Sequence, residues 1–105
     1  MILINVERDS VCMGDDVNAP HFYSFKLPIN TTLNDTFEHL SQQRYLPSIS
    51  GVNHFWEILI DDEFIAKIIG NNHIPESSSK LSCTLLEYTT NGILNVRFKY
   101  TSSNT

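Results

Sequence analysis

Short runs of β-branched and aromatic residues recur along the chain and predict β-strands. Six such runs span residues 2–8, 22–29, 55–60, 64–69, 81–88 and 93–101. In the last run apolar and polar positions alternate, which predicts a strand with one face in the core and the other in water. The Asn91-Gly92 pair before this run is a strong hairpin signal, and Asp61-Asp62-Glu63 predicts a second hairpin between two apolar runs.

The hydrophobic period changes after Thr32, where the sequence predicts an amphipathic helix over residues 33–44. Leu33, Phe37 and Leu40 recur at the i, i+4, i+7 spacing that lines one helix face. Thr32 is the predicted N-cap, because a threonine hydroxyl can accept a hydrogen bond from the first helical turn. Pro47 ends the segment.

This order of elements predicts one α+β domain over residues 1–105. We expect a mainly antiparallel sheet of about six strands, with one helix after the second strand. The ββαββ order resembles the β-grasp, or ubiquitin-like, arrangement followed by a C-terminal hairpin, and the segment LPINTTLNDTFEHL resembles the entry into that fold's helix. The chain lacks the terminal Gly-Gly of ubiquitin-like modifiers, which argues against a modifier role.

Charge and cysteine content indicate which kind of partner and which cellular compartment to expect. Twelve acidic against seven basic residues give a net charge of −5, which argues against nucleic acid as a direct partner and favours a basic protein. Cys12 and Cys83 form no CxxC pair, so reduced thiols in the cytoplasm are expected. The apolar start is too short for a signal peptide or a membrane span, which predicts a soluble protein without membrane contact.

The loop before residue 22 concentrates groups that could carry chemistry, namely Cys12, Asp15, Asp16 and His21. These are zinc-ligand types, and a thiol beside an imidazole and a carboxylate could also act as a nucleophile. However, their spacing matches no zinc signature, and the chain has no glycine-rich cofactor loop. We therefore expect no metal, no cofactor and no enzyme activity, with a small metal- or thiol-dependent enzyme as the alternative.

Asp61-Asp62-Glu63 forms the second candidate cluster. Three adjacent carboxylates repel one another, so they make either a solvated turn or an acidic projection that docks on a basic surface. Asp15 and Asp16 would extend the projection if the two loops lie at one end of the sheet. Tyr23 and Trp56 could anchor a partner if exposed, but their dense strands favour core positions.

The segments ERDSVCMGDDVNAPH, YLPSISG and FWEILID together resemble a group of small, largely uncharacterised bacterial proteins with an SVCMGDD-x-x-APH opening. In size, charge and architecture the chain also resembles immunity proteins of contact-dependent growth inhibition and related polymorphic toxin systems. The resemblance implies a protein that neutralises a nuclease toxin, and the toxins of these systems include ribonuclease-A-like ones. Immunity proteins act by occlusion, so it implies no catalytic residue.

Physical chemistry is compatible with this expectation, because a nuclease cleft is cationic and attracts an acidic domain. The expected contact residues are Asp15, Asp16, His21, Tyr23, Asp61, Asp62 and Glu63, with Tyr45 as a further aromatic candidate. Carboxylates would pair with toxin lysines or arginines, and an aromatic ring would fill a pocket. A third hypothesis is a β-grasp scaffold that binds through a sheet edge with little salt dependence.

Overall fold

Five strands and one α-helix form the part of the chain that the computed structural model describes, which is residues 1–9, 22–43, 45–46, 54–70, 72 and 74–102. In chain order they are β1 (Ile2–Arg8), β2 (Phe22–Leu27), α2 (Leu33–Gln42), β3 (His54–Ile60), β4 (Glu63–Ile69) and β5 (Ile93–Ser102). Two short 3₁₀ helices, η1 (Ser79–Ser82) and η2 (Leu85–Glu87), precede β5.

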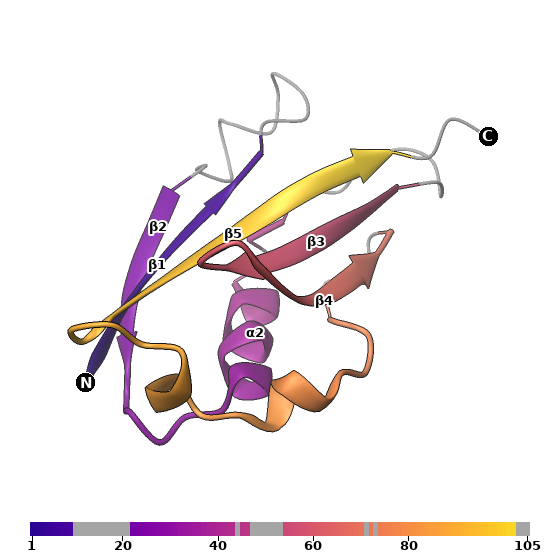
Figure 1. The fold of residues 1–105 in the computed structure, drawn as a ribbon. Helices are drawn as coiled ribbons and strands as arrows, with labels where there is room; N and C mark the ends of the chain where they lie inside the picture. The colour runs from indigo at the N-terminus through magenta and orange to yellow at the C-terminus, as the bar shows by residue number, and fades with distance from the viewer. Residues whose placement is uncertain (10–21, 44, 47–53, 71, 73, 103–105) are drawn as a thin grey trace.

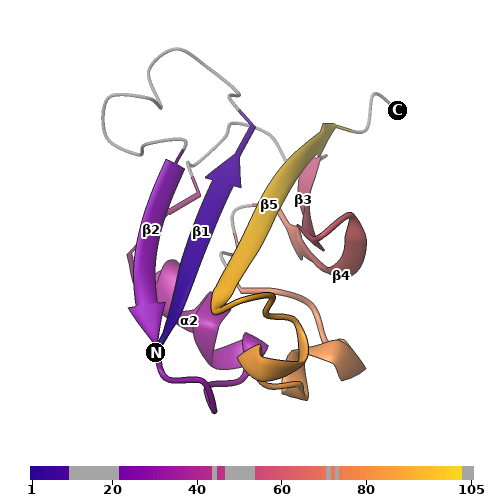
Figure 2. The ribbon, with the colours of Figure 1, turned by 60° about the vertical axis from the view of Figure 1, so that its left-hand side comes forward.

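The strands form one mixed sheet in the order β2-β1-β5-β3-β4. At its centre β1 and β5 run parallel, while the other neighbouring strands pair antiparallel. Helix α2 lies across one face of the sheet, and the 3₁₀ helices lie beside it (Figure 1). The turned view shows the first and last strands side by side (Figure 2). The predicted α+β class is thus confirmed.

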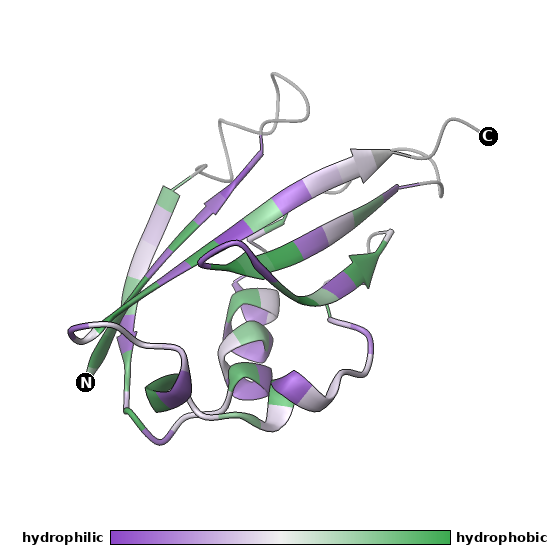
Figure 3. Cartoon of the chain, viewed as in Figure 1, coloured by the Kyte–Doolittle hydropathy of each residue, from purple (hydrophilic) through white to green (hydrophobic). Residues whose placement is uncertain are grey.

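Alternation along the strands, interrupted by a bulge in β4, separates a core face from an open face, which we define as the sheet face turned away from α2. The buried strand residues include Ile4, Val6, Trp56, Ile58, Leu94, Val96 and Phe98, and α2 meets them with Leu33, Phe37 and Leu40. Their neighbours along each strand are exposed or half-buried. Figure 3 shows this alternation of hydropathy along β5. Trp56 lies in the core, as predicted.

Helix α2 begins where the sequence predicts and ends slightly earlier. The Thr32 hydroxyl accepts a hydrogen bond from the Asp35 N–H at 3.1 Å, which confirms the N-cap. The cap is tied to the chain before β5 as well, because the Thr31 carbonyl accepts from the Leu85 N–H at 2.8 Å. The helix ends at Gln42 rather than at residue 44. Pro47 lies outside the described residues.

The predicted sixth strand, over residues 81–88, is wrong. These residues form η1, η2 and their connection, with Leu81 and Leu85 buried. The capping box of Thr84 and Glu87 stabilises the helical turn, because the Glu87 carboxylate accepts from the Thr84 N–H at 2.9 Å. The Asn91-Gly92 turn is present, but β5 then pairs with β1 and β3 instead of closing a C-terminal hairpin. The described sheet therefore has five strands rather than about six.

Candidate functional site

A row of side chains crosses all five strands on the open face. Register pairs Phe22 with Glu7, Glu7 with Arg97, Arg97 with Leu59 and Leu59 with Phe64. Phe22 is 72% exposed and Phe64 45% exposed, although both are large apolar side chains. Two exposed aromatic rings thus flank a pair of opposite charges, an arrangement typical of protein-binding surfaces.

A β-bulge in β4 gives Phe64 its place in this row. The register between β3 and β4 shifts after Ile58, so that Ile65 and Ala66 are both buried. An extra residue in one strand changes the face on which the following side chains lie. Phe64 consequently lies opposite Leu59 on the open face rather than in the core.

The turn between β3 and β4 holds two aspartates in an unusual backbone conformation. Asp61 has φ +50° and Asp62 has φ +68°, both in the left-handed region. Two successive residues with positive φ make the tight hairpin turn that Asn-Gly sequences favour. Both aspartates are exposed, and neither has an ion-pair partner among the residues that the structure describes. We call this pair the acidic turn.

A shallow hollow of about 390 Å³ lies between the acidic turn and the middle of the open face. Its lining consists of Asn5, Val6, Glu7, Phe22, Leu59, Asp61, Asp62, Asn95, Val96 and Arg97. Asn5 donates to the Asn95 side chain at 3.2 Å and accepts from the Ser24 hydroxyl at 2.7 Å, which fixes the floor of the hollow. The hollow therefore combines a preformed floor with an acidic rim.

Negative charge dominates around the hollow. The Arg97 guanidinium is the one cation of the described lining, and it pairs with Asp9 at 2.9 Å. The second oxygen of Asp9 accepts from the Tyr100 backbone N–H at 3.0 Å, so this carboxylate is held rigidly. The carboxylates of Glu7 and of the acidic turn are then in excess over positive charge in the described lining. A cationic side chain of a partner would find unneutralised carboxylates here.

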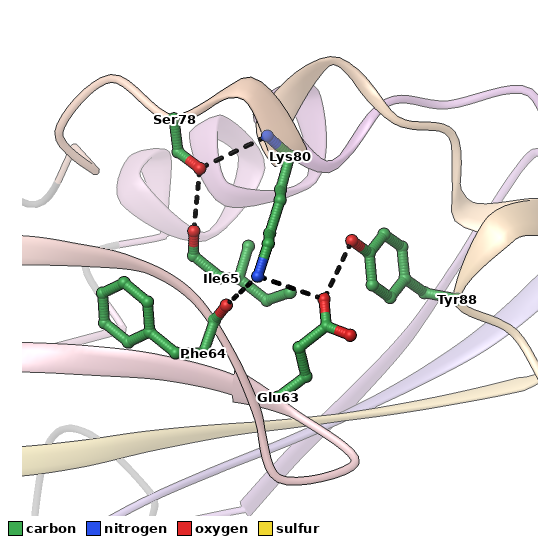
Figure 4. Close-up of polar contacts among 6 residues, drawn as sticks. All are labelled: Glu63, Phe64, Ile65, Ser78, Lys80 and Tyr88. Carbon is green, nitrogen blue, oxygen red and sulfur yellow. Dashed lines mark hydrogen bonds and ion pairs between the residues drawn. The ribbon is translucent and has the colours of Figure 1, made fainter.

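Glu63 differs from the two aspartates because it takes part in a structural network (Figure 4). Its carboxylate forms an ion pair with Lys80 at 3.3 Å and accepts from the Tyr88 hydroxyl at 3.2 Å. Partial burial, this hydrogen bond and the charge of Glu63 raise the pKa of the Tyr88 phenol. Lys80 also donates to the Phe64 carbonyl at 2.6 Å. Glu63 thus ties β4 to the 3₁₀ helices.

The candidate contact residues, together with Cys12 of the alternative enzyme hypothesis, separate into three groups. Cys12, Asp15, Asp16 and His21 lie outside the described residues. Tyr23 is half-buried on the core side, where its ring stacks on Phe25 at 5.3 Å, and Tyr45 is buried. Asp61 and Asp62 are exposed and line the hollow, whereas Glu63 is paired.

Sequence reasoning missed the aromatic part of the surface. Phe22 shares its face of β2 with Ser24 and Lys26, whereas Tyr23 shares its face with Phe25 and Leu27. The polar pair at 24 and 26 was the available signal that the even positions face water.

Other chemistry has less support in the described part of the chain. No group of three or more His, Cys, Asp or Glu side chains there could hold a metal ion. Cys83 is a free, half-buried thiol whose pKa is raised by desolvation and by Glu87, which makes it a weak nucleophile. The helices found in the described ranges are too short or too polar to span a bilayer.

Comparison with known proteins adds no family to this description. No protein-family model matches the sequence, and no curated protein is detectably similar to it.

Proposed function

We propose that the chain is an immunity-type protein that binds a basic nuclease toxin and blocks it by occlusion. The acidic turn carries the proposal, since two exposed carboxylates without an ion-pair partner in the described residues stand at the rim of an acidic hollow. The net charge of −5 favours the same kind of partner. In this proposal the protein takes part in no chemistry.

Different residues of the open face make different contacts in the proposed complex. Asp61 and Asp62 pair with lysine or arginine side chains that otherwise hold phosphate. Phe22 contributes the apolar contact area that a charged rim alone lacks, because exposed aromatic residues dominate the energetics of many interfaces. Asp15, Asp16 and His21 belong to the proposal as further contacts, on the strength of the sequence.

The proposal is tested by co-expressing the chain with the toxic C-terminal domain encoded beside it. We expect a stoichiometric complex that abolishes RNA cleavage and weakens as salt rises, because exposed charge pairs are screened. Full nuclease activity in the presence of the chain, or the lack of a neighbouring toxin gene, would overturn the proposal. A thiol-dependent enzyme would instead reveal itself by rapid alkylation of Cys12 below neutral pH.

A charge reversal locates the contact surface. We expect D61K/D62K to weaken the complex about 30-fold or more, since loss of a close charge pair costs about 2–5 kcal/mol. The matched control is D35K/E38K, which changes the net charge equally at two exposed positions on α2. Isothermal titration should show at most a threefold loss for this control, as expected for long-range attraction alone. Equal losses of affinity in both variants would show that the acidic turn is not part of the contact surface.

A further inference from the structure

The two outer strands of the sheet differ in how their edges are protected. The chain after β4 covers the edge of that strand. Glu76 donates its N–H to the Lys67 carbonyl at 2.8 Å, and the Ser78 hydroxyl donates to the Ile65 carbonyl at 2.9 Å. Such coverage is a common protection against pairing with another chain. No hydrogen bond of this kind from the described residues reaches the outer side of β2.

The outward-facing groups of β2 follow from the pairing of β1. The Leu3 N–H donates to the Gly92 carbonyl, so the odd-numbered residues of β1 bond to β5 and the even-numbered ones to β2. Ile4 pairs with Phe25 and Val6 with Tyr23. The backbone groups of Phe22, Ser24 and Lys26 therefore point outward from the sheet edge.

We propose that β2 pairs with β2 of a second copy of this chain, antiparallel and centred on Ser24, to form a continuous sheet in a symmetric dimer. In this register Ser24 faces the partner's Ser24 and exchanges both backbone hydrogen bonds with it. Phe22 faces the partner's Lys26, and its own Lys26 faces the partner's Phe22. The two-fold axis passes through the Ser24 pair, so the contact between Phe22 and Lys26 occurs twice.

Side-chain complementarity favours this register and this partner. On the open face the ammonium of Lys26 meets the ring of the partner's Phe22, which is exposed in the single chain. On the other face Tyr23 meets the partner's Phe25, and aromatic pairs across strands are stabilising. Pro28 cannot donate to a ladder, so a register centred on residue 24 uses residues 22–26 and leaves it outside.

Sedimentation equilibrium tests the dimer with variants that exchange the facing groups. Because two short strands bury a small interface, the protein is measured from about 10 µM to about 1 mM. We expect the weight-average mass to rise from 12.0 kDa toward twice that value. F22K places two lysines opposite each other and should hold the mass at 12.0 kDa. F22K/K26E restores opposite charges and should recover the dimer.

F64K is the matched control, because Phe64 is also an exposed aromatic residue but lies on the covered edge. We expect this variant to dimerise like the parent. A parent that stays at 12.0 kDa throughout, or a dimer abolished by F64K and unaffected by F22K, would overturn the proposal.

Amide hydrogen exchange gives a second, independent readout. In the dimer the N–H groups of Ser24 and Lys26 become hydrogen-bonded, so their exchange should slow about tenfold or more between dilute and concentrated protein. Tyr23 and Phe25 bond to β1 and should be protected at both concentrations, which also verifies folding of each variant. Concentration-dependent protection on β4 instead of β2 would overturn the assignment. Neither result depends on toxin binding, so this dimer and the proposed function can fail separately.

Discussion

Two tight turns in the described part of the chain have similar backbone conformations but different residues. At Asn91-Gly92 the φ angles are +54° and +78°, and at Asp61-Asp62 they are +50° and +68°. Asn-Gly is the favoured pair for this geometry, whereas aspartates in the left-handed region are less stable and repel each other here. The acidic turn therefore holds residues that its backbone conformation alone does not favour.

Replacing the acidic turn with the residues of the second turn should stabilise the protein. We expect D61N/D62G to raise the free energy of unfolding by about 1 kcal/mol, because it relieves strain and charge repulsion. D61N/D62N is the control that removes charge without introducing glycine, and it should gain less. Urea unfolding monitored by circular dichroism measures both. A destabilised D61N/D62G would show that the acidic turn is not strained.

Tyr45 gives the stability a predictable dependence on alkaline pH. Burial raises the pKa of its phenol well above the ordinary value of 10.0, and the nearby Arg8 offsets this only in part. The unfolded chain then releases the proton more readily than the folded chain, so stability is full below pH 10 and falls above it. For one proton the slope is at most about 1.4 kcal/mol per pH unit.

Y45F removes this ionisation and should flatten the alkaline decline. Urea unfolding of the parent and of Y45F between pH 8 and pH 11 measures the difference. We expect the difference in stability between the two proteins to be constant below pH 9 and to change in favour of Y45F above pH 10, because only the parent loses stability through this ionisation. Curves that stay parallel to pH 11 would assign the decline to other groups.

At the scale of elements, the sequence predicts those whose period is carried by their own residues. Leu33, Phe37 and Leu40 define α2, and alternation from Leu94 to Tyr100 defines β5. The strand predicted around Leu81 and Leu85 is wrong because the apolar residues of this segment fit either period. Ser78 and Thr84 cap the first turns of this segment and so stabilise 3₁₀ helices rather than a strand.

Only the part of the candidate site that is formed by adjacent residues could be predicted from the sequence. The acidic turn follows from adjacent residues, which the sequence displays directly. The row from Phe22 to Phe64 depends on strand order and on the bulge near Leu59. Both arise from long-range pairing, and local patterns do not specify which strands become neighbours.

At the scale of the whole molecule, the last strand completes the centre of the sheet. β5 lies between β1 and β3, and its core side chains Leu94, Val96 and Phe98 contact the layer under α2. Truncating one such residue to alanine typically costs about 2–4 kcal/mol, so losing all three is comparable with a domain's whole stability of about 5–15 kcal/mol. Strands β2-β1 and β3-β4 would also lose their connection.

The central position of β5 predicts that folding is all-or-none with respect to the C-terminal strand. A chain ending at Gly92 should lack the dispersed amide spectrum of a folded protein, because β1 and β3 would each have an unpaired edge and the core would lose Leu94, Val96 and Phe98. A chain ending at Ser102 keeps all of β5 and serves as the control, which we expect to give the dispersed amide spectrum and the cooperative urea unfolding of a folded protein. Heteronuclear NMR and urea unfolding distinguish the two chains. A cooperative, folded chain ending at Gly92 would mean that β1, β2 and α2 form a core by themselves, and the central parallel pair would then be an addition to the fold instead of its organising element.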